Sequence, residues 1–379
     1  MRIAMIGVKG IPAKWGGMEK YVEEIGSRLV QRGHEVTVFG SRWYCANYKE
    51  DYYKGIRIRR MPTIHSQAAD ALSNAFMAAI SIILGNYDIV HFHGYASYYF
   101  VIPLRLLGHK TVVTTHGLAD AEWANPKYGK LGHFIIRLAG GIGIRHANRI
   151  STVARYWQKT IREKFRIDPE VLPGGLDEPV QLPARIINDK YGLTSGDYIL
   201  FLGRIDPIKR VDWVTRLSLT DNAIKLVIAG GTQDESTRGY LEGIITEASG
   251  NDQVIFTGPV FGDEKSELLS NCKFLVNPSS SEGLPITVLE AMSYGRCCVA
   301  SNIPAHKEII DDGLTGFLFD WKSMEDFQLK VKDVSMLSAF ALKTIGLRAK
   351  LQTASQYDWD RTAQLTEDVY KGLINDQKR

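Results

Sequence analysis

Two glutamates, Glu282 and Glu290, offer the clearest chemistry in this chain of 379 residues. Glu282 follows a run of serines, and seven residues that include Gly283 and Pro285 separate it from Glu290. This spacing corresponds to a little over two turns at about 3.6 residues per turn. If a helix begins near Pro285, it carries Glu290, and Glu282 lies on the loop before it. Proline costs little at a helix start, because its missing N–H would have no partner there.

The same segment combines groups that bind hydroxyls with groups that bind phosphate. Gly283 lets the backbone approach a ligand closely, and the free N–H groups at the helix start form a site for an anion. One carboxylate can accept hydrogen bonds from hydroxyl groups, and the second can accept them from another diol. A sugar nucleotide needs all of these groups together. The alternative is a helix with two solvated acids.

Apolar runs on both sides of this segment favour the ligand-binding interpretation. Residues 274–276 and 297–300 are typical of buried strands. Glu282 therefore belongs to a strand–loop–helix–strand unit and follows the carboxyl end of the first strand. Open parallel sheets bind their ligands at that edge.

The segment from Phe274 to Gly316 resembles the retaining glycosyltransferases of family 4, which have two Rossmann-like domains (the GT-B fold) and an E-x7-E motif. The stretch from Ile6 to Glu19 (IGVKGIPAKWGGME) is similar to a bacterial subgroup that includes polysaccharide rhamnosyltransferases. The resemblance covers nearly the whole chain, and its motifs occur in the expected order. It implies transfer of a sugar from a nucleoside diphosphate sugar to an acceptor, with retention at the anomeric carbon.

Two cations, Arg204 and Lys209, follow the first strand of the second half of the chain, in the sequence GRIDPIK. A diphosphate leaving group gains negative charge as a glycosidic bond breaks, so nearby cations stabilise the transition state more than the ground state. Both residues match the phosphate-binding pair of the family. Solvated surface cations are the alternative.

The resemblance also implies roles for the residues around the glutamates. Glu282 and the Gly283–Pro285 backbone would orient the donor sugar, and Glu290 would hold the ribose hydroxyls. Val260 belongs to a segment that resembles the loop bordering the nucleobase. The expected donor-binding residues are Gly16, Gly17, Arg204, Lys209, Val260, Glu282, Gly283, Leu284, Pro285, Ile286, Thr287 and Glu290. The expected catalytic residues are His116, Glu282, Arg204 and Lys209.

The N-terminal half supplies further candidates. Gly16 and Gly17 lie in the first strand–helix turn, where backbone N–H groups can approach a phosphate or the acceptor; a plain tight turn is the alternative. Glu19 follows at the helix start, where the dipole favours an acid in any case, and is an acceptor candidate. His116 matches the family's histidine beside the donor sugar. His93 is a second acceptor candidate, and a structural role is the alternative for both histidines.

We expect no metal and no other cofactor. His91 and His93 alternate along a strand, but no carboxylate or cysteine lies near them in the sequence. Glycosyltransferases that this chain resembles generally need no metal. The four cysteines have no metal-like spacing, which indicates reduced thiols in the cytosol.

Short apolar runs alternate with helical patterns along the chain, which is typical of parallel α/β architecture. We expect two domains: an acceptor-side Rossmann-like domain at 1–180 and a nucleotide-sugar-binding one at 181–359, facing a central cleft. By resemblance, a closing helix at 360–379 crosses back to the first domain. The expected strands are 2–6, 35–39, 88–92, 110–114, 149–153, 198–202, 224–229, 253–256, 273–276 and 297–300.

Charge is distributed unevenly along the chain. Residues 1–180 contain 24 Lys and Arg against 15 Asp and Glu, and the remainder contains 22 against 27. A basic half suggests an anionic partner or surface. A peripheral contact with an anionic membrane that carries a lipid-linked acceptor fits better than nucleic acid, and an ordinary solvated surface is the third alternative. No signal peptide is visible, and no apolar run is long enough to span a bilayer. We therefore expect a cytoplasmic protein, which lies at the inner face of the membrane if the peripheral membrane contact forms.

The motifs leave the substrates open. UDP-hexose is the leading donor, because the segment 116–123 departs from the rhamnosyltransferases. dTDP-rhamnose is the alternative. The acceptor is expected to be a saccharide or a lipid-linked saccharide in the synthesis of surface polysaccharide or glycolipid. No enzymic nucleophile is evident in the motifs, so the family suggests front-face displacement. A sugar-nucleotide epimerase of the same architecture and a non-catalytic binding protein are the rival functions.

Overall fold

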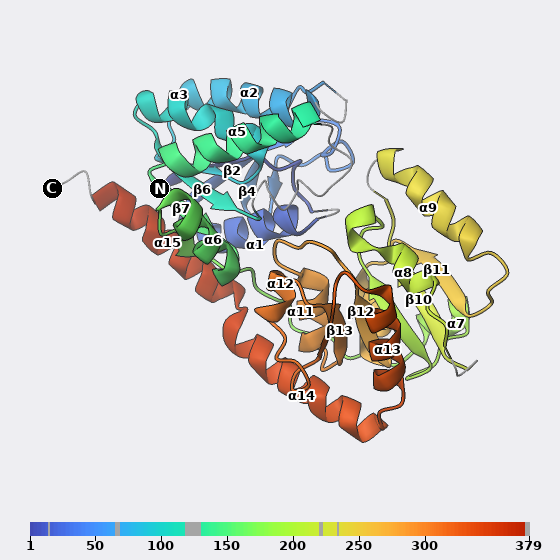
Figure 1. The fold of residues 1–379 in the computed structure, drawn as a ribbon. Helices are drawn as coiled ribbons and strands as arrows, with labels where there is room; N and C mark the ends of the chain where they lie inside the picture. The colour runs from blue at the N-terminus through green and yellow to red at the C-terminus, as the bar shows by residue number, and fades with distance from the viewer. Residues whose placement is uncertain (14–15, 65–68, 118–129, 220–222, 233–234, 376–379) are drawn as a thin grey trace. The chain divides into compact units, whose positions relative to one another are not determined.

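The computed structural model describes residues 1–13, 16–64, 69–117, 130–219, 223–232 and 235–375. The chain divides into two compact units, each with its own sheet (Figure 1). The first unit comprises Met1–Gly175 with Asp358–Arg379, and the second comprises Leu176–Tyr357. The borders therefore lie five residues before the expected first border and two before the expected second one.

Eight strands form the sheet of the first unit among the described residues, in the order β3-β4-β2-β1-β5-β6-β7-β8. They are β1 (Arg2–Ile6), β2 (Glu35–Ser41), β3 (Tyr52–Tyr53), β4 (Ile56–Met61), β5 (Ile89–Phe92), β6 (Lys110–Thr115), β7 (Arg149–Thr152) and β8 (Glu170–Val171). Neighbours pair in parallel, except for the antiparallel β3–β4 hairpin. The central strands are buried on both faces, as sheets covered by helices require.

Helices cover this sheet. They are α1 (Gly17–Gln31), α2 (Ala69–Ile83), η1 (Tyr95–Phe100), α3 (Val101–Leu106), α5 (Lys130–His146), α6 (Arg155–Phe165) and α15 (Trp359–Asn375). The helix α1 buries Val22, Ile25 and Leu29 on one stripe, at the spacing of an amphipathic helix. The C-terminal helix α15 packs on α1, within the first unit (Figure 1).

The sheet of the second unit is parallel throughout its described strands, in the order β11-β10-β9-β12-β13-β14. The strands are β9 (Tyr198–Leu202), β10 (Lys225–Ala229), β11 (Val254–Gly258), β12 (Phe274–Asn277), β13 (Cys298–Ser301) and β14 (Phe317–Phe319). The helical elements are α7 (Ile186–Tyr191), η2 (Pro207–Lys209), α8 (Val211–Thr215), α9 (Glu235–Glu247), α10 (Gly262–Asn271), α11 (Ile286–Ser293), α12 (Pro304–Lys307), α13 (Met324–Ser335) and α14 (Ala339–Gln356).

Each sheet has a point at which the strand order reverses. In the first unit this point lies between β1 and β5, and in the second it lies between β9 and β12. The crevice outside the carboxyl ends of such a strand pair is the usual ligand site of an open parallel sheet. The candidate ligand-binding loops are therefore those after β1 and β5 in the first unit and those after β9 and β12 in the second.

No described helix combines the length and the apolar character that crossing a lipid bilayer would require.

Candidate active site

Lys209 and Glu282 form an ion pair between the loops that follow β9 and β12. The Lys209 Nζ atom lies 2.6 Å from both Oε1 and Oε2 of Glu282. Their side chains are only 16% and 8% exposed, respectively. The Ser279 hydroxyl lies 2.7 Å from Oε1 of the same carboxylate. Glu282 is therefore an acceptor already supplied with donors from both loops.

Opposing effects set the charge of the Glu282 carboxyl. Burial alone would raise its pKa, because the charged form loses hydration. The Lys209 ammonium and the hydrogen bonds from Lys209 and Ser279 outweigh burial and hold the pKa below its ordinary value. The carboxylate therefore stays ionised at neutral pH and can accept hydrogen bonds from sugar hydroxyls.

Short backbone features bring this pair together. The Asp206 carboxylate accepts a hydrogen bond of 3.1 Å from the Ile208 N–H at the start of η2. Arg210, with φ of 49°, ends this turn in the left-handed region. The Ser280 N–H donates to the Ile208 carbonyl at 2.8 Å. This last bond joins the loop after β12 to the loop after β9, and it fixes the approach of the two charges.

Arg204, the other expected phosphate ligand, is half-buried at the end of β9. The described residues supply it with no hydrogen-bond or ion-pair partner. Lys209, by contrast, is paired with Glu282. One cation of the expected pair is therefore free for an anion, and the other shares its charge with a carboxylate. Their joint role toward a diphosphate stays a prediction.

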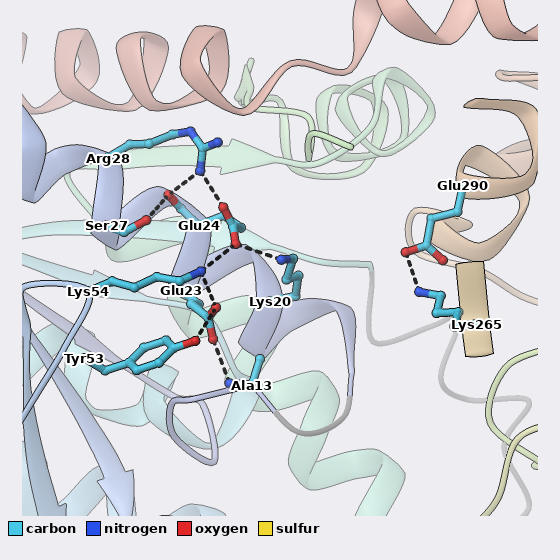
Figure 2. A network of polar contacts seen from close by, with 10 residues as sticks. All are labelled: Ala13, Lys20, Glu23, Glu24, Ser27, Arg28, Tyr53, Lys54, Lys265 and Glu290. Carbon is cyan, nitrogen blue, oxygen red and sulfur yellow. Dashed lines mark hydrogen bonds and ion pairs between the residues drawn. The ribbon is translucent and has the colours of Figure 1, made fainter. Parts of the chain in front are cut away.

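The helix α11 begins at Ile286, directly after Pro285, as the sequence predicted. The segment Gly283–Thr287 thus forms the loop end and the first turn of this helix. The Ile286 N–H donates to the Leu284 carbonyl at 2.9 Å, whereas the Thr287 N–H has no acceptor one turn back in the helix. Glu290 follows one turn later, and its Oε1 atom lies 2.7 Å from Lys265 Nζ of α10 (Figure 2). The Glu290 Oε2 atom is buried and has no hydrogen-bond partner. A buried carboxylate oxygen without a donor marks a place for a ligand hydroxyl.

Val260 has a different environment. Its side chain is 7% exposed and belongs to the apolar core of the second unit. It follows β11, which ends at Gly258 in the left-handed region with φ of 72°. A contact from this loop to a nucleobase would therefore come from the backbone.

In the first unit, the loop between β1 and α1 is held by acids of the helix that it enters. Glu19 is 9% exposed, and its Oε1 atom accepts a hydrogen bond of 3.3 Å from the Lys9 N–H. Gly16 precedes the helix with φ of 90°, and Gly17 is its first residue. Glu19 therefore has a structural role in the loop, and its contact with an acceptor stays a prediction. Residues 14 and 15 of the motif lie outside the described residues.

Glu23, one helical turn beyond Glu19, fastens the same loop. Its carboxylate accepts hydrogen bonds of 2.8 Å from the Ala13 N–H and 2.9 Å from Lys54 Nζ (Figure 2). Sequence reasoning missed this role. The available signal was the pair of acids four positions apart on the helix that follows a glycine-containing loop, a spacing that puts both on one helix face.

His93 and His116 end adjacent strands, β5 and β6, and their rings meet. The His93 Nδ1 atom lies 3.2 Å from His116 Nε2. Burial lowers the pKa of His116 to about 4. Burial, with His91 and His116 close by, lowers the pKa of His93 well below its ordinary value. Both imidazoles are therefore neutral at pH 7, so each offers one N–H donor and one acceptor nitrogen.

His91 has a satisfied structural position. Its ring nitrogens lie 2.6 Å from the Tyr370 hydroxyl and 2.6 Å from the Thr114 hydroxyl. Tyr370 belongs to α15, so this contact fastens the C-terminal helix to β5. Burial, and secondarily His116, lowers the pKa of His91 to about 3. Within the described part of the chain, no group of three or more His, Cys, Asp or Glu residues could hold a metal ion; the prediction that no metal is needed stays a prediction.

Sequence reasoning also missed Ser279 and Lys265, which contact the two glutamates. Ser279 offered a weak signal, because it belongs to the serine run before Glu282. Lys265 offered none, since it lies 25 positions from Glu290 on a different helix.

Two parallel α/β units, each with polar residues at its strand-order reversal, define the architecture of GT-B glycosyltransferases. Two protein-family models match the chain: the model of glycosyl transferases group 1 over residues 185–344, and the model of glycosyltransferase family 4 over residues 15–178. The chain therefore belongs to the family 4 type of glycosyltransferases and is a transferase enzyme.

Known proteins are similar over nearly the whole chain. The D-inositol 3-phosphate glycosyltransferase of Mycobacterium leprae is 24% identical over 392 residues, with 95% of this chain and 89% of that protein covered. The structure of sucrose-phosphate synthase from Thermosynechococcus elongatus matches with a TM-score of 0.85 at 18% identity, covering 99% of both chains. Anabaena HepE in complex with UDP-glucose matches with a TM-score of 0.78 at 15% identity, covering 98% of this chain and 100% of that one. These two structural likenesses establish the fold.

Proposed function

We propose that this glycosyltransferase transfers a hexose from UDP-hexose to a saccharide or lipid-linked saccharide, with retention at the anomeric carbon. The observation that carries the proposal is the pair of loops at the strand-order reversal of the second unit. There an unpartnered Arg204 and the Lys209–Glu282 ion pair combine cations with an ionised carboxylate. A nucleoside diphosphate sugar presents a diphosphate and hydroxyl groups, which need these two kinds of partner.

The ribose would bind at Glu290. Its unpartnered Oε2 atom can accept a hydrogen bond from one ribose hydroxyl. Lys265, held 2.7 Å from Oε1, keeps further N–H donors for the neighbouring hydroxyl oxygen. HepE, a protein of the same fold, binds UDP-glucose, which supports uridine as the base.

In the proposed reaction, Arg204 and Lys209 stabilise the charge that develops on the leaving diphosphate. Glu282 accepts hydrogen bonds from the donor sugar, and the Thr287 N–H in the first turn of α11 donates to an oxygen of the ligand. The acceptor hydroxyl attacks the anomeric carbon from the same face as that from which the leaving group departs. The leaving phosphate oxygen takes the acceptor's proton. His116, neutral at pH 7, would contribute a hydrogen bond at the reacting centre.

The acceptor is proposed from the subgroup resemblance of residues 6–19. It would be a growing saccharide, free or linked to lipid, in the synthesis of a surface polysaccharide or glycolipid. The D-inositol 3-phosphate glycosyltransferases act on a small phosphorylated acceptor, as their name states. The choice between hexose and rhamnose rested on the segment 116–123, of which residues 118–123 lie outside the described residues. dTDP-rhamnose therefore stays the alternative donor.

A thermal-shift panel in EDTA tests the donor site. UDP, dTDP, GDP, ADP and NAD are compared on the wild type and on Glu290→Ala and Lys209→Ala. Glu247→Ala, which removes a surface ion pair to Arg216 in the same unit, is the matched control. We expect UDP to raise Tm most in the wild type and the control, and to have little effect in the two site variants. Stabilisation by NAD alone, or equal stabilisation of wild type and site variants, contradicts the proposed site.

Turnover separates the rival functions. A transferase releases nucleoside diphosphate in proportion to the acceptor that it glycosylates. A sugar-nucleotide epimerase converts the sugar nucleotide without an acceptor and without net release of nucleoside diphosphate. A non-catalytic protein binds the nucleotide and gives neither product. Chromatography of the sugar nucleotides with and without a saccharide acceptor distinguishes these three results.

A further inference from the structure

The first unit exposes large apolar side chains on two of its helices. Three lie on α2, with Phe76 51%, Ile80 37% and Ile83 46% exposed, and three lie on α5, with Leu131 72%, Phe134 62% and Leu138 49% exposed. On each helix these residues follow the spacing of one helical stripe. We name the surface formed by these six residues the α2–α5 face. Surface helices normally present polar residues on such a stripe.

The two stripes belong to one continuous layer. Both α2 and α5 pack on η1. The ring of Phe76 lies 6.2 Å from that of Phe100 in η1. On the other side, the Tyr99 hydroxyl donates a hydrogen bond of 2.7 Å to the Ile135 carbonyl of α5. The exposed rows on the two helices are therefore held on one rigid support.

The opposite faces of these helices already form the core of the unit. On α2, Ala75, Ala78 and Ile82 are at most 1% exposed, and on α5, Ala139 and Ile144 are each 1% exposed. The side chains of the α2–α5 face are thus not part of the apolar core that stabilises the first unit. Large apolar side chains that stay exposed on neighbouring elements mark a site of interaction with a partner or a membrane.

The charges around the α2–α5 face indicate which kind of partner it binds. Arg105 of α3 and Lys130 and Arg145 of α5 are exposed cations of this layer. Among the described residues of α2, η1, α3 and α5, Asp70 is the only acid, and it is 7% exposed and bonded to Ser41 and Trp43. In their described residues, these four elements therefore present apolar side chains and cations without an exposed carboxylate.

We propose that the α2–α5 face binds the surface of an anionic phospholipid bilayer, with its apolar side chains in the interfacial region and its cations at the lipid phosphates. An amphipathic surface with apolar and basic residues has this binding mode, and anionic headgroups attract basic residues near the surface. A second copy of the chain is disfavoured as the occupant. In a twofold contact the same patch meets itself, so the cations of each copy would face one another.

Membrane binding would bring the enzyme to a lipid-linked acceptor at the lipid surface. In this respect the proposal rests on the proposed function. The binding itself needs no sugar nucleotide. Its test is therefore separate from the test of the donor site.

Flotation of the full chain with vesicles tests the proposal. Vesicles of phosphatidylcholine alone are compared with vesicles of phosphatidylcholine and phosphatidylglycerol at 7:3, at low and high salt. We expect binding to the anionic vesicles at low salt and at least a tenfold weaker partition to the neutral ones. The double variants Phe76→Gln/Ile80→Gln and Phe134→Gln/Leu138→Gln are each expected to lower partition to the anionic vesicles at least tenfold. Lys130→Gln/Arg145→Gln is expected to lower it severalfold.

The matched control is Phe340→Gln/Leu347→Gln on α14, which removes two exposed apolar side chains of the second unit, 81% and 56% exposed. It should bind vesicles like the wild type. Retained UDP-induced stabilisation in every variant shows that the chain is folded and that the donor site is intact. The proposal is overturned if the wild type does not bind anionic vesicles, if the α2–α5 variants bind like the wild type, or if the α14 control loses binding. Concentration-dependent dimers that the α2–α5 substitutions dissociate, without vesicle binding, would assign the face to a second copy instead.

Discussion

His93 Nδ1 and His116 Nε2 lie 3.2 Å apart, so one of these two neutral imidazoles donates an N–H hydrogen bond to the other. The direction of this hydrogen bond decides which nitrogen of His116 remains a donor. If His93 donates, the Nδ1 atom of His116 carries its proton; if His116 donates, its Nδ1 atom is an acceptor. The Nε2 atom of His93 is buried without a partner, so the bond between the two rings orients His93 as well as His116.

We expect His93→Phe to lower kcat about tenfold while the KM for the donor changes little. Phenylalanine keeps a ring against His91, whose centroid lies 4.1 Å from that of His93, but it leaves His116 without its partner. His116→Ala should cost more, about 100-fold, if His116 hydrogen-bonds to the reacting centre. Nitrogen-15 chemical shifts of labelled histidine report the tautomer of His116. A single unchanged tautomer in His93→Phe would refute the positioning role.

Lys209→Met should lower kcat/KM by about 100- to 1,000-fold, because it removes a cation beside the leaving diphosphate. It also leaves the 8% exposed Glu282 carboxylate without its ion-pair partner. Such a loss costs stability, so we expect a lower Tm and proton uptake by Glu282 at higher pH than in the wild type. Lys190→Met, which breaks a half-exposed ion pair with Glu264, is the control. Steady-state kinetics and thermal unfolding give both readouts, and equal effects of the two substitutions would contradict the prediction.

Lys265→Met should weaken UDP binding about tenfold and reduce the preference for UDP over 2′-deoxy-UDP. The physical reason is that Lys265 holds Glu290 through Oε1 and leaves Oε2 for a ribose hydroxyl. Isothermal titration with the two nucleotides measures the preference. If the preference for UDP over 2′-deoxy-UDP is unchanged in Lys265→Met, Lys265 has no role in recognition of the ribose.

Stability should depend on the charge of Glu24. Burial would raise its pKa, but hydrogen bonds from Lys20 and Arg28 outweigh burial and lower the pKa to about 2 (Figure 2). Because the folded-state pKa is below the unfolded value, this contribution is complete above the unfolded pKa, near 4.5, and is lost as the pH falls toward 2. We expect Glu24→Gln to cost about 1–2 kcal/mol at pH 7, since ion pairs that are partly exposed are screened by solvent.

Chemical denaturation of wild type and Glu24→Gln at pH 7, 5, 4 and 3 measures this dependence. The difference in unfolding free energy between the two proteins should be constant from pH 7 to 5 and then shrink. A difference that stays the same down to pH 3 would show that the carboxylate charge of Glu24 does not contribute.

Gly230→Ala should destabilise the second unit by about 3 kcal/mol or more. A Cβ atom at position 230 would lie 1.7 Å from the Gly203 carbonyl oxygen, and φ of 155° is unfavourable for alanine. Because Gly203 precedes Arg204, UDP binding should weaken too. Gly239→Ala is the matched control, since its Cβ would meet nothing within 4 Å in the middle of α9, and alanine favours a helix. Thermal unfolding should therefore show opposite shifts for the two variants.

Much of the fold was evident from the sequence, because strands buried on both faces consist of continuous apolar runs. The strands 2–6 and 198–202 were predicted with their observed bounds, and the other predicted strands lie within one or two residues of the observed ones. The β3–β4 hairpin, β8 and β14 were missed. The reason is visible in β4, where buried Ile56 and Ile58 alternate with exposed Arg57. Such a short alternation near a sheet edge resembles an ordinary polar segment.

The residue types at the candidate site followed from the sequence alone. Glycine, proline and glutamate at fixed spacing, and arginine and lysine after a strand, are local patterns, and local backbone preferences and chemistry determine what they can do. These patterns selected Arg204, Lys209, Glu282 and Glu290 as candidates, and the family resemblance that they carry predicted the class of enzyme.

Only the tertiary structure decided the partners of these residues. Lys209 pairs with Glu282, Glu290 with Lys265, and Glu23 with the Ala13 backbone, across separations of 73, 25 and 10 positions. Such contacts depend on which strands neighbour one another and on how loops close, because an ion pair forms between groups that the sheet order brings together. The exposure of the apolar residues of α2 was likewise decided by the tertiary structure. Packing buried one face of that helix and left the other exposed, since the sheet can cover only one side of a surface helix.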